Sequence, residues 1–170
     1  VFDIGVSSMQ LDEAERGFSF SKEGALDMRM SQSGLSAKDI VNTYGEQELA
    51  DLIYQYGEER KSRQIARQIA EYRKHKEIET TTELAEIIYK VIHKKFGEID
   101  PATRTFQALR IAVNDELGEL SRGLSGAANR LLKNGRLVVV DFHSLEDRIV
   151  KKFFNENGGR RVRVSKYAPE

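Results

Sequence analysis

The 170-residue sequence contains no cysteine. It can therefore form neither disulfide bonds nor thiolate metal sites, and the absence weakly favours a reducing compartment. The sequence also has no apolar run of 18 residues and no segment resembling the hydrophobic part of a signal peptide. We accordingly expect no membrane-spanning helix, no membrane partner and a cytoplasmic location.

Two further absences narrow the possible enzyme classes. No glycine-rich phosphate-binding loop is present, which argues against phosphoryl transfer. Ser7, Ser8 and Ser144 are weak candidates for a nucleophile, because none lies in a G-x-S-x-G elbow. A hydrolase that uses Asp3 and Asp141 would therefore lack a nucleophile.

The net charge of zero conceals segments of opposite sign. Residues 58–76 carry seven Lys or Arg against three Glu, and residues 146–170 carry seven against four acidic residues. Residues 9–27 carry five acidic residues against two basic ones. Two basic segments together with an acidic loop suit a polyanionic ligand that approaches an acidic reaction centre. Equally, solvated helix faces are often basic by chance.

Two apolar segments are predicted to be strands that end in an aspartate. The first runs to Asp3 and breaks into a loop with glycine and serine, and the second is Leu137 to Val140, followed by Asp141. The unbroken apolar character of the second segment predicts a central parallel strand buried on both faces. If both strands belong to one parallel sheet, their loops lie side by side at its carboxyl edge, where ligands bind in α/β proteins. Ser144 is the expected N-cap of the helix that follows.

A metal site near the second strand is the less favoured interpretation. His143 is close in sequence to Asp141, Glu146 and Asp147. Strand residues alternate between faces, and helix residues a few positions on point elsewhere, so we expect these side chains not to converge. We predict no metal ion.

The hundred or so residues between the strands are predicted to be mainly helical. A loop at 14–30, rich in Phe and Met, is expected to pack its own side chains, and Phe18, Phe20 or Met28 could offer a face to an unstacked base. Helices are then expected over 37–43 after an N-cap at Ser36, and over 46–56, 59–74, 80–96, 101–124 and 126–132.

Two polar rows stand out on these helices. Arg60, Arg63 and Arg67 fall on one side of the helix predicted at 59–74, opposite its apolar stripe. This basic ridge is either a surface for phosphates or an ordinary solvated face. Gln107, Arg110 and Asn114 form a second row, which either braces a neighbouring loop or touches a ligand.

Six sequence blocks in one order give the chain a specific resemblance. They are Asp3-Ile-Gly-Val-Ser-Ser-Met-Gln-Leu-Asp12, Arg16-Gly-Phe-Ser-Phe20, Leu26-Asp-Met-Arg-Met30, Tyr56-Gly-Glu-Glu-Arg60, Ala102-Thr-Arg-Thr-Phe-Gln-Ala108 and Phe142-His-Ser-Leu-Glu-Asp-Arg148. Together they resemble the RsmH (MraW) family of bacterial 16S ribosomal RNA cytosine-N4 methyltransferases, over nearly the whole chain.

The resemblance implies an α/β fold: part of a Rossmann-like class I methyltransferase sheet with a mainly helical inserted domain. It implies S-adenosylmethionine as cofactor and a cytidine in the decoding region of the small ribosomal subunit as substrate. Residues 1–30 would hold a strand end and active-site loop, 31–100 the inserted substrate-recognition domain, and 101–170 the return to the methyltransferase domain. The family's cofactor contacts carry over to Asp3 and Gln10, while others lie in segments that this sequence does not contain, so we expect an incomplete form of the enzyme.

The reaction itself suggests which residues take part. Methyl transfer to the exocyclic amine of cytosine needs groups that orient the amine and accept its protons. We take Asp3, Ser7, His143 and Ser144 as catalytic candidates. The candidates for binding the substrate are Asp27, Arg29 and Asp147, with the ridge Arg60, Arg63 and Arg67 against the RNA backbone.

A second function remains open on the sequence alone. A chain without the rest of the cofactor site could be a non-catalytic RNA- or ribosome-binding fragment, and a homodimer could cover an exposed sheet edge. Each candidate residue also has a structural alternative. Asp3 could cap its loop, Asp147 could serve only the helix dipole, and Arg110 could be a brace.

Overall fold

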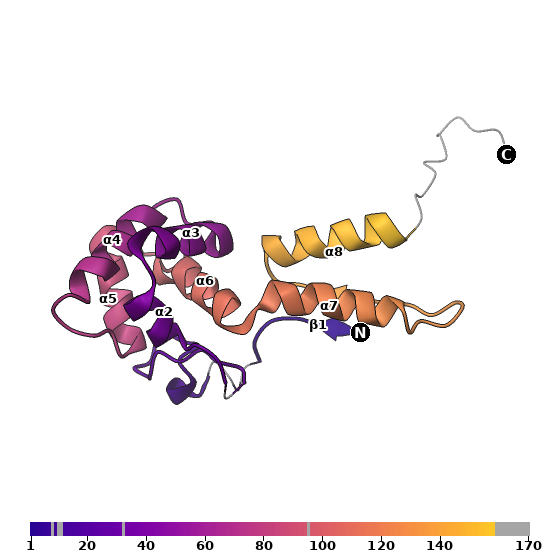
Figure 1. Cartoon of the computed structure of the whole chain (residues 1–170), viewed down its shortest axis with the longest axis horizontal. Helices are drawn as coiled ribbons and strands as arrows, with labels where there is room; N and C mark the ends of the chain where they lie inside the picture. Colours follow the sequence, from indigo (N-terminus) through magenta and orange to yellow (C-terminus); the bar gives the residue numbers. More distant parts are fainter. Residues whose placement is uncertain (8, 10–11, 32, 95, 159–170) are drawn as a thin grey trace. The chain divides into compact units, whose positions relative to one another are not determined.

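A computed structural model describes residues 1–7, 9, 12–31, 33–94 and 96–158 (Figure 1). Contacts between residues divide the chain into two compact units. Unit 1 consists of Val1–Gly5 and Leu117–Glu170, and unit 2 of Val6–Glu116. Among the described residues, no helix combines the length and the apolar character that crossing a membrane requires.

Unit 2 is helical, with a core built from amphipathic faces. After the short 3-10 helix η1 (Ala14–Arg16), it contains α2 (Ala37–Thr43), α3 (Glu46–Gly57), α4 (Ser62–Tyr72), α5 (Thr81–Val91) and α6 (Ala102–Asn114). Helix α3 packs against both α4 and α6. Their facing aliphatic side chains are fully buried, among them Leu49, Ile53, Ile65, Ile69 and Leu109.

Two of these helices begin where the sequence predicts, because their caps are local. Ser36 Oγ accepts the amide hydrogen of Asp39, whose carboxylate accepts the amide hydrogen of Ser36, and Thr80 and Glu83 form the same capping box. Helix α3 also begins at the expected Glu46, whereas two other boundaries need correction. Helix α4 begins at Ser62 rather than 59, and α5 ends at Val91 rather than continuing to the fully exposed Phe96.

The single helix expected over 101–124 is wrong, because two helices occupy this region. Helix α6 ends at Asn114, Asp115 adopts a left-handed conformation with φ 46°, and α7 runs over Glu116–Ala128. The apolar residues of the expected single helix are correspondingly divided between the two units. Phe106 and Leu109 lie in the core of unit 2, whereas Leu120 and Leu124 lie in that of unit 1.

Unit 1 combines α7 with a parallel pair of strands, β1 (Phe2–Asp3) and β2 (Val139–Val140), and with α8 (Ser144–Asn157). The protein is thus a mixed α and β structure with a small parallel sheet. Leu120, Leu124 and Val150 form the buried centre of unit 1. Ile4 and Val139 from the strands pack against it.

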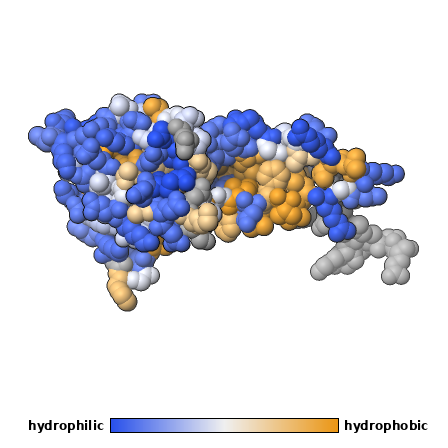
Figure 2. All heavy atoms as spheres, turned by 90° about the horizontal axis from the view of Figure 1, so that it is seen from below, coloured by the Kyte–Doolittle hydropathy of each residue, from blue (hydrophilic) through white to orange (hydrophobic). Residues whose placement is uncertain are grey.

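The expectation that the second strand is buried on both faces is wrong for the described structure. Val138 and Val140, which alternate with the packed Val139, are 49% and 43% exposed. Val1 and Phe142 are also exposed, and apolar side chains gather on the surface of this unit (Figure 2). One face of the small sheet is therefore packed and the other is open.

Candidate active-site loops and nucleic-acid interface

The two strand-end loops of unit 1 lie side by side, as the sequence predicts. Asp3 pairs with Val140, and the amide of Ile4 donates to the carbonyl oxygen of Val140 over 3.1 Å. Beyond the strands, a Cβ atom added to Gly5 would lie 3.5 Å from Cδ2 of Phe142, and Gly5 has φ 107°. The carboxylate of Asp3 is exposed at this edge. A ligand there could meet Asp3 and both loops.

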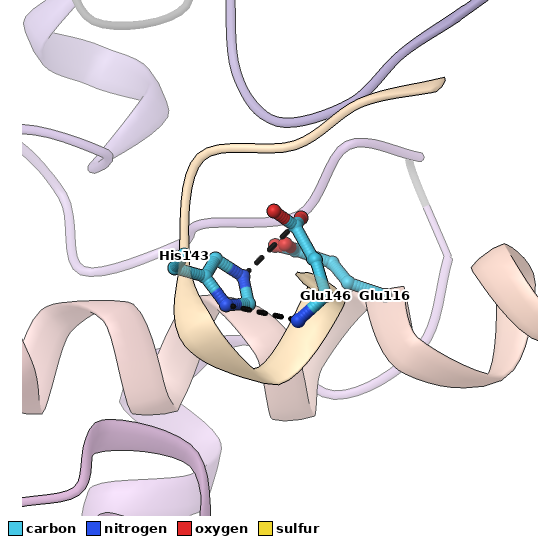
Figure 3. Close-up of side chains that lie close together, drawn as sticks. All are labelled: Glu116, His143 and Glu146. Carbon is cyan, nitrogen blue, oxygen red and sulfur yellow. Dashed lines mark hydrogen bonds and ion pairs between the residues drawn. The ribbon is translucent and has the colours of Figure 1, made fainter. Parts of the chain in front are cut away.

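His143 caps helix α8 in place of the expected Ser144 (Figure 3). Its Nδ1 atom accepts the amide hydrogen of Glu146 over 3.4 Å, and its Nε2 atom lies 3.2 Å from Oε1 of Glu146. The other carboxylate oxygen of Glu146 accepts the amide hydrogen of Phe142 over 3.1 Å. The prediction that His143 and Glu146 diverge is therefore wrong, because a cap and the third helical residue meet across the first turn.

This arrangement gives Glu146 a clear structural role. Its side chain is only 1% exposed, and it ties the strand-end residue Phe142 to the first turn of α8. His143 is half-buried against it, whereas Ser144 is exposed at the start of the helix. Asp147 pairs with Lys151 at 2.7 Å. Sequence reasoning missed Glu146, although a carboxylate three residues after a helix cap is the known signature of such a turn.

The remaining described catalytic candidate, Ser7, lies outside unit 1. Ser7 is exposed and belongs to unit 2. Gln10 lies outside the described residues. Within unit 1, the structure therefore places Asp3, His143 and Ser144 on the two strand-end segments.

The loop at 12–30 is fixed to unit 2 by its backbone. The amides of Ala37 and Lys38, in the first turn of α2, donate to the carbonyl oxygens of Asp27 and Leu26 at 2.8 and 2.7 Å. Phe18, Leu26 and Met28 are buried in the core. Phe18 and Met28 consequently cannot stack on a base in this structure, which corrects that expectation. Phe20, half-buried and packed edge-on against Phe106, remains partly accessible.

Asp27 and Arg29 hold each other at the end of this loop. The guanidinium of Arg29 donates from Nε and Nη2 to both carboxylate oxygens of Asp27, at 2.7 and 2.8 Å. The hydrogen bonds from Arg29 hold the pKa of Asp27 below its usual range. A pocket of about 450 Å³ lies beside the pair and is also lined by Glu15, Arg16, Met30 and Ser31. A ligand in this pocket would meet a pair that is already ordered.

Replacing Asp27 with asparagine tests this pair through its pH dependence. Because the folded pKa of Asp27 is lowered, its stabilisation is present above the ordinary carboxyl pKa and is lost as the pH falls through the folded value. We expect Asp27→Asn to lower the free energy of unfolding by about 1 kcal/mol at pH 7 and by much less at pH 3. Urea unfolding at both pH values measures this. An equal loss of unfolding free energy at pH 7 and pH 3 would show that the ion pair is not the source of the loss.

The row Gln107, Arg110 and Asn114 braces neighbouring segments, which decides between its two interpretations. Gln107 donates to the carbonyl oxygen of Tyr56 at 3.1 Å. Arg110 forms a bidentate ion pair with Glu116, in which Nε and Nη2 donate to the two carboxylate oxygens at 2.7 and 3.0 Å. The amide of Asn114 donates to the carbonyl oxygen of Met28 and accepts the amide hydrogen of Met30, at 2.8 and 2.7 Å. Asn114 thus holds the left-handed turn at Met28, where φ is 63°.

The basic ridge of Arg60, Arg63 and Arg67 is exposed along α4 and the turn before it. No ion pair joins any of the three to another residue that the structure describes. Arg73 behaves differently, since it donates to the carbonyl oxygens of Val41 and Tyr44 at 2.7 and 2.6 Å. The three ridge arginines are therefore exposed and held by no ion pair within the described part of the chain, although the charge of Arg67 acts on the nearby Glu71, whereas Arg73 is a brace.

The parallel strand pair, with an aspartate at its carboxyl end, and the helical unit define a protein of mixed helices and strands that carries a row of exposed arginines on α4 and the turn before it. A family model, the MraW methylase family, matches residues 1–166. The chain belongs to this family.

Several curated relatives carry the same name. The chain is 62% identical over all 170 residues to the ribosomal RNA small subunit methyltransferase H of Rickettsia massiliae (strain Mtu5), of which it covers 55%. It is 59% identical over 99% of its length to the protein of that name from Paramagnetospirillum magneticum (strain ATCC 700264 / AMB-1), of which it covers 53%. The chain thus spans about half the length of the curated relatives that it matches.

Proposed function

We propose that the protein acts in the S-adenosylmethionine-dependent methylation of the N4 amine of a cytidine in the decoding region of 16S ribosomal RNA. The observation that supports this most is the family match over residues 1–166 together with Asp3 at the end of a parallel strand. Relatives named ribosomal RNA small subunit methyltransferase H support the substrate class. The site of action would be the cytoplasm, where ribosomes assemble.

The proposal assigns unit 1 to a Rossmann-like sheet. The open face at Val138 and Val140 supports it, because an isolated pair of two-residue strands is too small to be stable alone. Further strands or a second copy of the chain would cover that face, so a homodimer is one possible assembly. In the assigned domains, 1–30 and 101–170 belong to the methyltransferase part and 31–100 to the inserted helical part.

The strand-end loops fit one side of a cofactor site. Asp3 is an exposed carboxylate that can accept hydrogen bonds from hydroxyl or amine groups, and Gly5 has no side chain to obstruct an approaching group. S-adenosylmethionine would supply the electrophilic methyl group. Asp3 and Gln10 would bind it, while Asp3 and Ser7 would orient the cytosine amine and accept its hydrogen bonds. His143 and Ser144 would complete the site from the second loop.

Methyl transfer to small ribosomal subunits tests the function directly. The 170-residue chain is incubated with radiolabelled S-adenosylmethionine and subunits that lack the modification, with Asp3→Asn as the matched variant. Label in 16S RNA that Asp3→Asn reduces at least 100-fold is the expected result. Calorimetric titration with S-adenosylmethionine accompanies the assay. Absence of both transfer and cofactor binding, with RNA binding retained, would favour the alternative of a non-catalytic RNA-binding fragment.

A further inference from the structure

A second groove in unit 2 is lined in part by residues from two of the six sequence blocks. It has a volume of about 470 Å³ and lies where the turn before α4 meets the start of α6. Glu59, from the block Tyr56–Arg60, and Arg104, from the block Ala102–Ala108, line it. The segment between α5 and α6 closes it with Ile92, His93, Ile99 and Asp100.

Glu59 is the unusual group in this groove. Its residue is only 7% exposed, although it carries a charge and lies beside the exposed basic ridge. One carboxylate oxygen accepts the amide hydrogen of Lys61 over 2.8 Å. The other lies 4.0 Å from Nη1 of Arg104, beyond hydrogen-bond distance. A buried carboxylate and a guanidinium thus face each other without a direct hydrogen bond.

Two exposed apolar side chains belong to the segment that lines the groove, beside the acidic Glu98 and Asp100. Ile99 is 77% exposed, and Phe96, directly before the lining residue Gly97, is fully exposed. An exposed phenyl ring loses the stabilisation of burial, and its π-face is what single-stranded nucleic acids use as a stacking platform. Lys94 and Asp100 pair with each other at 2.7 Å and so present little net charge.

The groove also adjoins the basic ridge. Lys61, which follows Arg60, donates from Nζ to the carbonyl oxygen of Val91 at the end of α5, directly before the groove-lining Ile92. Arg60 and Glu59 are neighbours in the chain and share the same turn. A strand whose phosphates lie on the ridge would therefore pass the mouth of the groove.

We propose that this groove receives one unpaired base of the RNA whose backbone lies along the Arg60–Arg63–Arg67 ridge. Phe96 stacks on the base, while Glu59 accepts a hydrogen bond from its edge and Arg104 donates one. Every nucleobase shows a donor beside an acceptor, so the pair recognises an unstacked base rather than one particular base. The site rests on the proposed function, because it needs RNA on the ridge.

Phe96→Trp provides a direct test, because the chain contains no tryptophan of its own. The new indole would be the sole fluorophore of its kind, at an exposed position that tolerates the exchange. The variant is titrated with a labelled single-stranded RNA 12-mer and with an abasic 12-mer that keeps the sugar–phosphate backbone. RNA is expected to quench the tryptophan emission, and the abasic strand is expected to bind without quenching it.

Phe96→Ala then measures the contribution of the ring. It is expected to weaken binding of the RNA 12-mer about tenfold and to leave the abasic strand unaffected. Tyr54→Ala, which removes another exposed aromatic ring of unit 2, is the control and should change neither. Binding seen by anisotropy without quenching would overturn the groove site and leave the ridge intact. No binding of either strand at low salt would overturn both the groove site and the RNA-binding surface.

Discussion

Gly57→Ala is expected to lower the free energy of unfolding of unit 2 by about 3 kcal/mol, which is at the upper end of the usual cost of overpacking. A Cβ atom at this position would lie 2.4 Å from the carbonyl oxygen of Arg104 and 3.3 Å from Cβ of Ala108. The first of these atoms belongs to the backbone of α6, so no side-chain rotation can relieve the clash. Helices α3 and α6 must separate, and their separation disturbs the buried centre of unit 2.

Gly45→Ala is the matched control for this measurement. Gly45 caps the other end of the same helix, has φ −60°, and an added Cβ atom would meet nothing within 4 Å. Its substitution is expected to cost less than about 1 kcal/mol, the cost of losing a glycine cap. Urea unfolding followed by circular dichroism compares the two variants. Equal small losses would show that α3 and α6 are not in close contact at Gly57.

Gly57 also shows what the sequence can and cannot predict. A glycine after an apolar helical stretch predicts a helix end, and α3 does end there. The conformational reason is different, because Gly57 is still helical and Glu58 takes the left-handed position with φ 51°. Glycine is required by the close approach of another helix some fifty residues further along the chain. Local patterns cannot reveal that contact.

The difference between local and distant contacts also separates the helix boundaries that are predicted correctly from those that are not. The caps at Ser36 and Thr80 are predictable because each involves residues three positions apart. The break at Asp115 is not, because the apolar period continues through it from Phe106 to Leu124. The break is explained only by the packing of the two ends of this apolar stretch in the cores of different units.

The candidate sites divide in a similar way. The adjacency of the Asp3 and Asp141 loops follows from parallel strands, so sequence reasoning could reach it. The cap formed by His143 was missed, because histidine is not a favoured N-cap residue. The pairing of Asp27 with Arg29 depends on how the loop turns at Met28, which is fixed by the distant Asn114.

Replacing the three ridge arginines together is expected to have the largest effect on RNA binding. Arg60, Arg63 and Arg67 are exposed, and no ion pair joins them to a residue that the structure describes. Each phosphate contact to a single strand contributes about 0.7 to the slope of log affinity against log salt. The triple glutamine variant should therefore lower that slope by about 2 and weaken binding about 100-fold near 0.1 M salt.

A second triple variant separates local contacts from net charge. Lys38, Lys76 and Lys151 are each paired with a carboxylate, so their replacement by glutamine removes the same total charge without removing free cations. We expect it to weaken RNA binding less than threefold and to leave the salt slope nearly unchanged. Fluorescence anisotropy at four salt concentrations measures both quantities. Equal losses in the two triple variants would assign the affinity to overall charge.

The salt slope is decisive because it counts phosphates independently of folding. A variant that merely unfolds would lose affinity at every salt concentration, and circular dichroism would show the loss of helix. If the ridge contacts the RNA backbone, the triple glutamine variant instead loses affinity most at low salt, where counterion release contributes most to the affinity of the unsubstituted chain. The remaining binding should then be nearly insensitive to salt and should still distinguish RNA from an abasic strand. That residual preference would come from aromatic stacking at Phe96, which salt does not screen.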